Sequence, residues 1–538
     1  MKKNLFTLLF LISAITAFSC TNFIVTKGAS ADGSTMMVYT NDGEWLYHLQ
    51  MYPHEKHEAK DVIKFNIPGT EDFLDIPQPS ETYKKLGFHM NEHQVAIGET
   101  TFTGREELWN QNFPLKYWHL MSLALDRAKT AREAVEVITS LVEKYGYGSE
   151  GESFSIIDPN EAWILEMIGV GDGKLGANWV AMKIPDGAIS AHANKARIGT
   201  FPLDDPENCL YSENVIDFAI EKGFFDPENG EPFRFNQAYN PISPDRLRYC
   251  ESRVWSLFRR AAPEQEFSSD YHRGVQGAER YPLWIFPEKK LSIKDVMGLV
   301  RDHYEGTEID MTKGLEAGPF GTPQRWRPLS WEDNGKTYAW ERPISTYNTC
   351  FSFIAQAKSQ MPNLGGTCWF GFDDTYFTVY LPIFMKINET PESYRKGDIR
   401  QYDPSSMWWA MNFVSNYANL KYSYMIKDIQ EVQNKLEDQM IAEQDSLIMR
   451  YYNKMLEDKQ VVLQNYVDSR AELILEEWNQ LGYKLIAKYN DGYIKPDSAG
   501  MLSPGYPEEW KKNIIEQNPD KHLIPDWNKE GRQEENPF

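Results

Sequence analysis

The stretch CTNFIVTKGASADGSTMMVYT, residues 20–40, decides the fold. Residues 21–26 and 34–40 are two β-prone runs, and the turn-forming pair Asp32-Gly33 lies between them. This pattern predicts a β-hairpin whose first strand begins at Cys20. The residues before Cys20 do not continue this β-strand pattern, so Cys20 lies at the boundary between two segments of different composition.

The first nineteen residues have the parts of an export signal. Lys2 and Lys3 form a basic start, residues 5–15 form an apolar run, and the small residues Ala17 and Ser19 precede Cys20. This run is too short to cross a bilayer, and no later stretch approaches the length of about 18 apolar residues that would. We therefore predict a protein exported to the periplasm or the extracellular space, with no membrane span after residues 1–19 are removed.

Composition and motifs exclude several classes of protein. The formal net charge of −22 argues against nucleic acid as a partner, because phosphate binding needs clustered Lys and Arg. The glycines follow no phosphate-loop pattern, so we predict no nucleotide cofactor. The segment 89–93, HMNEH, fits the inverted zinc-protease pattern, which requires a helix. Residues 94–100 alternate like a strand instead, so no metal site is predicted.

The rest of the chain mixes helices with strands that follow one another directly. Helical spacing predicts a helix pair in 114–145, a helix in 245–260 and a helical region from about residue 405, followed by a loop-like tail beyond residue 496. Further short strands are predicted at 153–158, 162–168, 178–184, 188–193, 346–356 and 376–382. Consecutive hairpins imply an antiparallel sheet covered by helices, which is an α+β class. We divide the chain into a signal peptide (1–19), a catalytic domain (20–400) and a helical C-terminal region with its tail (401–538).

Cys20 is the candidate nucleophile. Cleavage after Ser19 would leave it with both a thiol and a free α-amine, and an amine that titrates near 8 can accept the proton of a thiol that titrates near 8.5. Two other interpretations stay open from these residues alone. Cys20 could carry a lipid anchor, although Ala17 stands where lipoprotein signals usually have Leu, and bulky Phe18 follows. Alternatively, the signal ends elsewhere and Cys20 is inert.

Four other cysteines are open to two interpretations. In an oxidising compartment they could form two disulfides in any of three connectivities, and their spacing favours none. They could equally be small buried thiols in a large core. These residues are Cys209, Cys250, Cys350 and Cys368.

A series of motifs in fixed order resembles peptidase family C69, whose characterised activity is that of dipeptidases. It begins with CTNFIV at Cys20 and continues to WFG at 369–371, and the intervening matches are 29–35, 41–43, 91–100, 158–166, 179–181, 189–198, 253–257 and 342–346. This resemblance implies an N-terminal-nucleophile hydrolase with a four-layer αββα sandwich, in which the catalytic residue starts a central strand. The family is related to the penicillin V and bile-salt acylases.

The resemblance also implies site residues. Asp42 matches the aspartate that orients the α-amine, Asn194 matches an asparagine that helps to form the oxyanion hole, and Arg253 matches one of the site arginines. This chain departs from the family at Tyr39, where many relatives have an arginine three residues before the aspartate. The positive charge that would shift the pKa of the Cys20 thiol must therefore come from another residue or be absent.

Three hypotheses follow from the sequence. The first is an exported cysteine peptidase that cleaves small peptides, most naturally dipeptides, through a thioester acyl-enzyme. The second keeps this chemistry but has an N-acyl amide as its substrate. The third is a lipid-anchored surface protein that binds a ligand without turnover. The oligomeric state is left open, and a homo-oligomer is compatible with each hypothesis.

Overall fold

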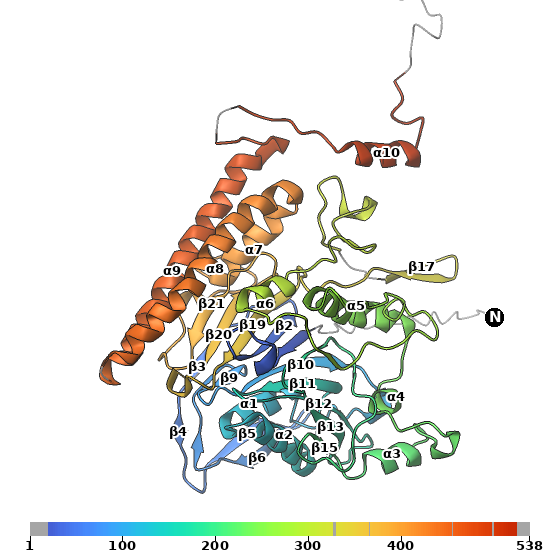
Figure 1. The fold of residues 1–538 in the computed structure, drawn as a ribbon, viewed down its shortest axis with the longest axis vertical. Coiled ribbons are helices and arrows are strands. Elements are labelled where there is room, and N and C mark those ends of the chain that lie inside the picture. The colour runs from blue at the N-terminus through green and yellow to red at the C-terminus, as the bar shows by residue number, and fades with distance from the viewer. Residues whose placement is uncertain (1–19, 326–329, 365, 455, 498–499, 525–538) are drawn as a thin grey trace, which may run out of the picture.

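Two large antiparallel sheets form the centre of the protein, as the computed structural model shows for residues 20–325, 330–364, 366–454, 456–497 and 500–524 (Figure 1). The predicted signal peptide and residues 525–538 lie outside this description. The first sheet has seven strands in the order β16 (Trp284–Ile285), β14 (Ile189–His192), β1 (Thr21–Val25), β2 (Thr35–Asp42), β19 (Thr349–Ala357), β20 (Thr367–Phe372) and β21 (Leu381–Phe384).

The second sheet has eight strands. Their order is β15 (Cys209–Tyr211), β13 (Ala177–Lys183), β12 (Ala162–Gly169), β11 (Gly151–Ile157), β10 (Ala96–Phe102), β9 (Met90–Asn91), β8 (Lys85–Leu86) and β3 (Met51–Tyr52). Three small hairpins or ribbons lie outside the two sheets: β5 (Val62–Asn66) with β6 (Phe73–Pro77), β4 (Glu55–Lys56) with β7 (Glu81–Thr82), and β17 (Ser330–Asp333) with β18 (Lys336–Ala339).

The two large sheets pack face to face, and helices cover their outer faces. Strands β1 and β2 contact β10 and β11 across the interface. Every residue of β1 and β2 is buried, as expected for strands in the middle of a layered structure. Helices α1 (Tyr117–Arg127) and α2 (Ala131–Tyr145) pack on the eight-stranded sheet, while α5 (Pro244–Ala261), α7 (Met407–Ala418), α8 (Tyr422–Tyr452) and α9 (Leu456–Tyr489) contact the seven-stranded sheet.

The predicted α+β class, the N-terminal hairpin and the predicted helices are confirmed. Strand β1 pairs with β2, so Cys20 directly precedes the first residue of a central strand. Helix α2 begins where the Thr130 side chain accepts a hydrogen bond from the Glu133 N–H, and it ends at Gly146, whose φ of 81° favours glycine. The shorter helices are α3 (Val215–Glu221), α4 (Phe235–Tyr239), α6 (Ile293–Leu299) and α10 (Glu508–Gln517).

Three details of the predicted strands and tail were wrong. Strand β14 does not continue the hairpins β11 to β13; it crosses to the other sheet and pairs with β1, with His192 opposite Asn22. The predicted strand at 376–382 begins only at Leu381, and β20 was not predicted. In the tail, α10 forms where only loop was expected, because the segment opens with acidic residues after Pro507, which favour the start of a helix.

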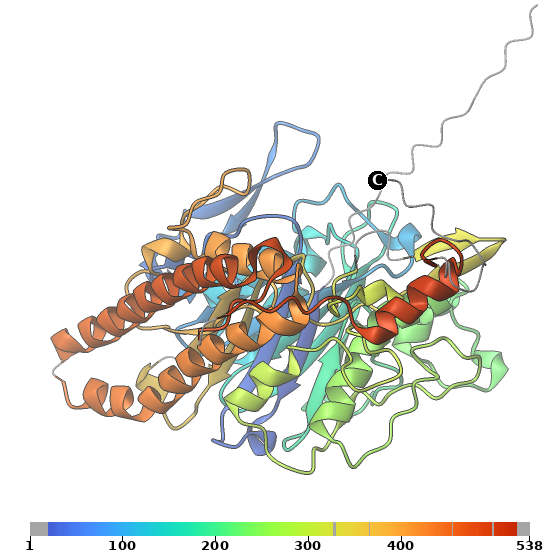
Figure 2. The ribbon, with the colours of Figure 1, turned by 90° about the horizontal axis from the view of Figure 1, so that it is seen from above.

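A buried ion pair is one of the contacts that join the C-terminal helices to the rest of the protein. Arg301, just after α6, donates two hydrogen bonds to Glu437 of α8, at 2.9 and 2.6 Å, and the Glu437 side chain is fully buried. The Tyr380 N–H also donates to this carboxylate. Helices α8 and α9 run side by side as a long pair (Figure 2). Their inner side is thus part of the helical layer over the seven-stranded sheet.

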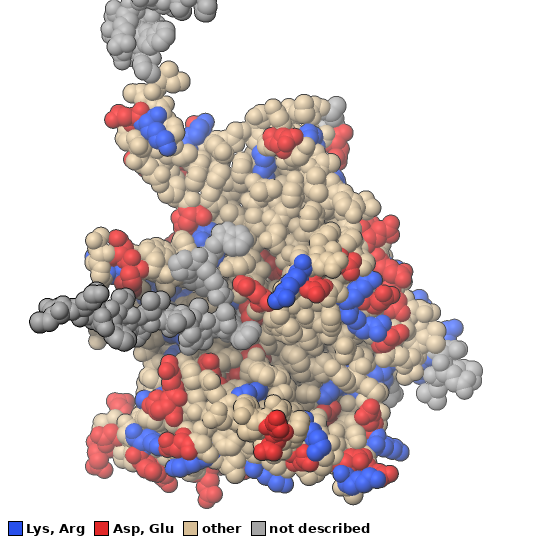
Figure 3. Space-filling model, turned by 180° about the vertical axis from the view of Figure 1, so that it is seen from behind, with Lys and Arg blue, Asp and Glu red and all other residues tan. Residues whose placement is uncertain are grey.

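On the face shown in Figure 3, acidic and basic side chains are interspersed rather than gathered into patches of one sign. Among the helices of the described residues, none combines the length and apolar character needed to cross a bilayer.

Candidate active site

Cys20 lies at the centre of the stacked sheets and is completely buried. It precedes β1, whose neighbours in the sheet are β14 and β2. The loop after β14 supplies Asn194, the end of β2 supplies Asp42, and helix α5 supplies Arg253. The structure therefore brings together all four predicted site residues, although more than 200 positions separate Cys20 from Arg253 along the chain.

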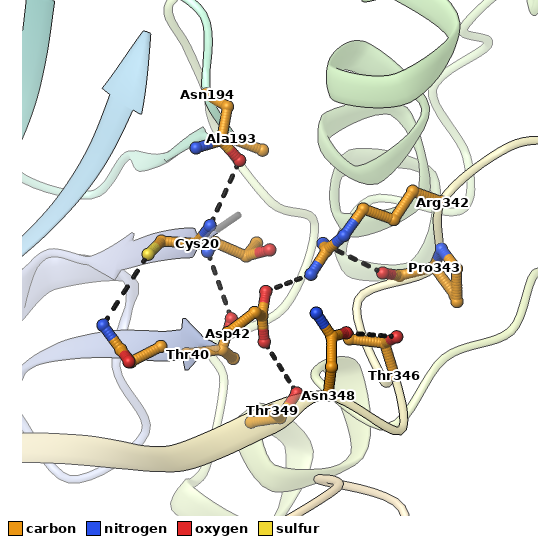
Figure 4. A network of polar contacts seen from close by, with 12 residues as sticks. Cys20, Thr40, Asp42, Ala193, Asn194, Arg342, Pro343, Thr346, Asn348 and Thr349 are labelled. Atoms are coloured by element: carbon orange, nitrogen blue, oxygen red, sulfur yellow. Dashed lines mark hydrogen bonds and ion pairs between the residues drawn. The ribbon is translucent and has the colours of Figure 1, made fainter. Parts of the chain in front are cut away.

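The backbone of Cys20 is held by Asn194 and Arg253. The Cys20 N–H donates to Asn194 Oδ1 at 3.1 Å (Figure 4), and Arg253 donates to the Cys20 carbonyl at 2.7 Å. Arg253 also donates to Asn194 Oδ1 at 2.9 Å, which fixes the orientation of this amide. Asn194 has a φ of 58°, a left-handed conformation that Asn tolerates better than most residues and that is common at functional sites.

The orientation of Asn194 bears on its predicted role. Its Nδ2 donates to the Thr101 carbonyl at 2.8 Å, while its oxygen faces the nitrogen of Cys20. An oxyanion donor must direct an N–H toward the reacting carbonyl oxygen. In the arrangement seen here, Asn194 positions the nitrogen of Cys20, and the oxyanion role stays a prediction that would require the amide to turn.

The thiol faces a second group of polar side chains. Cys20 Sγ donates to Glu99 Oε1 at 3.3 Å and lies 3.8 Å from the Tyr39 hydroxyl. Tyr39 donates a short hydrogen bond to the same Glu99 oxygen, and Asn41 Nδ2 donates to the Tyr39 hydroxyl at 2.7 Å. Tyr39 therefore presents a neutral hydroxyl near the thiol, at the position where the family resemblance implies an arginine. The Arg253 guanidinium contacts the Cys20 carbonyl rather than the sulfur.

Glu99 and Glu152 form a buried carboxyl pair beside the thiol. Burial raises the pKa of Glu99, and burial together with the neighbouring Glu99 raises the pKa of Glu152 well above its ordinary value. Burial, reinforced by the carboxyls of Glu99 and Asp42, also raises the pKa of the Cys20 thiol. At neutral pH the thiol thus keeps its proton in this environment, and it needs a base or a nearby positive charge before it can act as a nucleophile.

Replacing Glu152 with glutamine is expected to change how stability depends on pH. In the unfolded chain this carboxyl ionises above about pH 4.3, whereas the native state retains the proton, so the wild-type free energy of unfolding falls as the pH rises through this window. The variant lacks this contribution and should gain up to about 1.4 kcal/mol per pH unit relative to wild type. Urea unfolding at pH 5.5, 6.5 and 7.5 measures the difference.

The matched control is Glu143→Gln on the exposed side of α2, which should follow the wild-type pH dependence. Parallel curves for wild type and Glu152→Gln would show that Glu152 is not held protonated.

Asp42 belongs to a separate buried ion pair at the other side of Cys20. Its carboxylate contacts Arg342 in a short charged hydrogen bond and accepts a hydrogen bond from Thr349 Oγ1 at 2.7 Å (Figure 4). Burial alone would lower the pKa of Arg342, but the adjacent Asp42 carboxylate raises it above its ordinary value. Sequence reasoning missed Arg342 and Glu99 as site residues, although both lie in motifs of the family resemblance.

The remaining cysteines and the zinc-protease motif form no further site. All five cysteines are buried free thiols in this structure. His89 lies among aromatic rings, including those of Phe351 and Phe353, and burial lowers its pKa to about 3. Within the described ranges, no group of three or more His, Cys, Asp or Glu side chains is arranged to hold a metal ion.

A buried thiol held among carboxyl, amide and guanidinium groups is typical of hydrolases that work through a cysteine. Comparison with known families narrows this class: the model of "Peptidase family C69" matches residues 19–435. The chain belongs to peptidase family C69, and the predicted family and enzyme class are confirmed.

Several curated proteins are similar over most of their length. A "Probable dipeptidase" of Latilactobacillus sakei is 29% identical over 438 residues, covering 75% of this chain and 82% of that protein. A "Probable dipeptidase" of Salmonella dublin is 27% identical, covering 74% and 88%. A "Probable dipeptidase B" of Streptococcus pyogenes serotype M1 is 26% identical, covering 81% and 86%.

Proposed function

We propose that the protein is an exported dipeptidase of the N-terminal-nucleophile type, with Cys20 as its nucleophile. One observation carries this proposal: the nitrogen and the sulfur of Cys20 are held by different partners, Asn194 on one side and Glu99 on the other. Such an arrangement suits a residue that supplies both the nucleophile and the base. The names of the C69 relatives support the dipeptide as substrate.

In the proposed reaction, removal of residues 1–19 frees the α-amine of Cys20. This amine takes the proton from Sγ, and the thiolate attacks the carbonyl carbon of the substrate's amide bond. The C–N bond breaks as the α-ammonium returns the proton to the leaving nitrogen, and a thioester remains on Cys20. Water, deprotonated by the same amine, then hydrolyses the thioester and releases the acid.

The surrounding residues position these atoms. Arg253 holds the Cys20 carbonyl, and Asp42 places a negative charge near the new ammonium, which stabilises its charged form. Glu99 keeps its hydrogen bond to the sulfur; in its protonated form it donates to the thiolate and stabilises it without adding charge.

The fold and location belong to the same proposal. We take the two stacked sheets with their helical layers as the αββα sandwich, residues 20–400 as the catalytic domain and residues 401–538 as a helical region with a tail. Export to the periplasm or the extracellular space rests on the basic start, apolar run and small residues of the sequence before Cys20.

The test has two parts. The mass of the purified, exported protein should correspond to a chain that begins with an unmodified Cys20. A diacylglyceryl group on Cys20 would instead support the lipid-anchored binding protein, and a chain beginning elsewhere would remove the nucleophile. Hydrolysis is then compared on dipeptides and on N-acyl amides, and turnover of the acyl amides alone would replace the dipeptidase by an acylase.

A further inference from the structure

A small cavity adjoins the candidate active site at the Asp42–Arg342 ion pair. Its volume is about 20 Å³, which holds a small polar group rather than a whole peptide. Arg342 lines it, so the cavity begins one side chain away from Asp42. The other lining residues are Tyr249, His303, Pro323, Gln324, Arg325, Pro343, Ser345, Thr346, Tyr347 and Asn348.

Two side chains of this wall have buried polar atoms without partners. Gln324 is 8% exposed, and neither its Nε2 nor its Oε1 makes a hydrogen bond. Arg325 is 6% exposed, and its Nε is also without a partner. Leaving such groups unpaired in a folded protein costs free energy, so a buried amide with both ends free in a cavity wall points to a ligand.

Arg325 is in addition a buried cation with no carboxylate in contact: Glu316 interacts with its charge only from a greater distance. Within the described part of the chain, its guanidinium donates to the main-chain carbonyls of Thr322, Gln324 and Met311 and lies 5.9 Å from the centre of the Trp340 ring. Among the residues that the structure describes, no carboxylate lies within 4.0 Å of it. A buried positive charge of this kind is stabilised by an anion, and the planar guanidinium matches a carboxylate.

We propose that Gln324 and Arg325 bind the C-terminal carboxylate of the peptide substrate. This inference rests on the proposed dipeptidase function and adds the group that selects the length of the substrate. Gln324 Nε2 and Arg325 Nε donate to the carboxylate, while Gln324 Oε1 accepts an N–H of the same substrate residue.

The position of the cavity explains why a dipeptide would be preferred. In a dipeptide the carboxylate belongs to the residue directly after the scissile bond, and neighbouring Cα atoms are about 3.8 Å apart. Each further residue moves the carboxylate away from Cys20 by up to a similar distance. The cavity is lined by Arg342, whose partner Asp42 also acts electrostatically on the Cys20 thiol, so we infer that a carboxylate bound there belongs to the residue after the cleaved bond.

The experiment compares a dipeptide with the C-terminal amide of the same dipeptide, which has the same scissile bond but no terminal charge. Wild type should hydrolyse the free acid with a kcat/KM roughly tenfold to a hundredfold higher than the amide, since one or two charged hydrogen bonds are lost. Gln324→Leu and Arg325→Met should reduce this ratio toward one, mainly by slowing hydrolysis of the acid.

Arg127→Met is the matched control, because Arg127 also donates to main-chain carbonyls. It lies on α1, which packs on the eight-stranded sheet. It should keep the wild-type ratio. Gln324→Leu leaves the carbonyl contacts of Arg325 in place, so it tests the site even if Arg325→Met unfolds. A wild-type ratio near one, or equal losses on acid and amide in Gln324→Leu, would overturn the inference while the dipeptidase function stands. If wild type cleaves neither compound, both proposals fail.

Discussion

Replacing Cys20 with alanine is expected to lower kcat/KM for dipeptides by a factor on the order of 10⁴ or more. The reason is that the thiol is the only nucleophile in the proposed mechanism, and the loss of an enzyme's nucleophile typically leaves only the contribution of binding. The measurement is hydrolysis of a dipeptide by purified variant and wild type, each shown by its mass to begin at residue 20.

Cys209→Ala is the matched control for this experiment. Cys209 is also a buried thiol, but it lies on β15 at the edge of the eight-stranded sheet, and burial raises its pKa to about 12. Its removal should leave the rate within a factor of about two, because an un-ionised thiol remote from the site has no chemical role. Dipeptide turnover that survives in Cys20→Ala would rule out the proposed nucleophile.

Asp42→Asn is expected to destabilise the protein by about 3–5 kcal/mol, because it leaves Arg342 as an uncompensated buried charge. Both side chains are almost completely buried, so solvent cannot replace the lost partner. Urea unfolding at pH 7 measures this loss, and dipeptide hydrolysis should fall as well, since Asp42 no longer favours the ammonium form of the α-amine.

The double variant Asp42→Asn/Arg342→Met should recover part of the stability, because both charges are then absent. It should not recover activity. The exposed pair of Lys64 and Asp75 on the β5–β6 hairpin supplies the control: Asp75→Asn should cost less than about 1 kcal/mol. A similar small cost for Asp42→Asn would mean that the pair at the site is not a buried charge pair.

Local patterns were sufficient to predict the N-terminal hairpin and the longer helices, but not α3, α4, α6 or α10. The turn at Asp32-Gly33 and the β-prone runs around it are complete within twenty residues, so the hairpin needs no distant information. The crossing of β14 is different. The turn at Pro185 to Gly187 has the residues of an ordinary hairpin turn. Only the buried surface of β1, more than 160 positions earlier in the chain, makes the other sheet the better partner for β14.

At the candidate site, too, local sequence patterns identify residues but not the contacts between distant segments. Cys20, Asp42, Asn194 and Arg253 could be named from motifs, but motifs do not show which end of an amide faces a partner. Glu99 is predicted to lie in a strand, yet only the stacking of β10 against β1 brings its carboxyl to the sulfur. Arg342 is likewise brought to Asp42 by the fold, across 300 positions of the chain.

The buried pair of Arg301 and Glu437 has a consequence for how the molecule comes apart. Removing the C-terminal helices would take away the carboxylate partner of Arg301 and uncover the edge strand β21, which α8 and α9 contact. The helical region and the two sheets should therefore melt together, as one cooperative unit. Trimming the gene at residue 400 would produce an aggregation-prone fragment instead of a minimal enzyme.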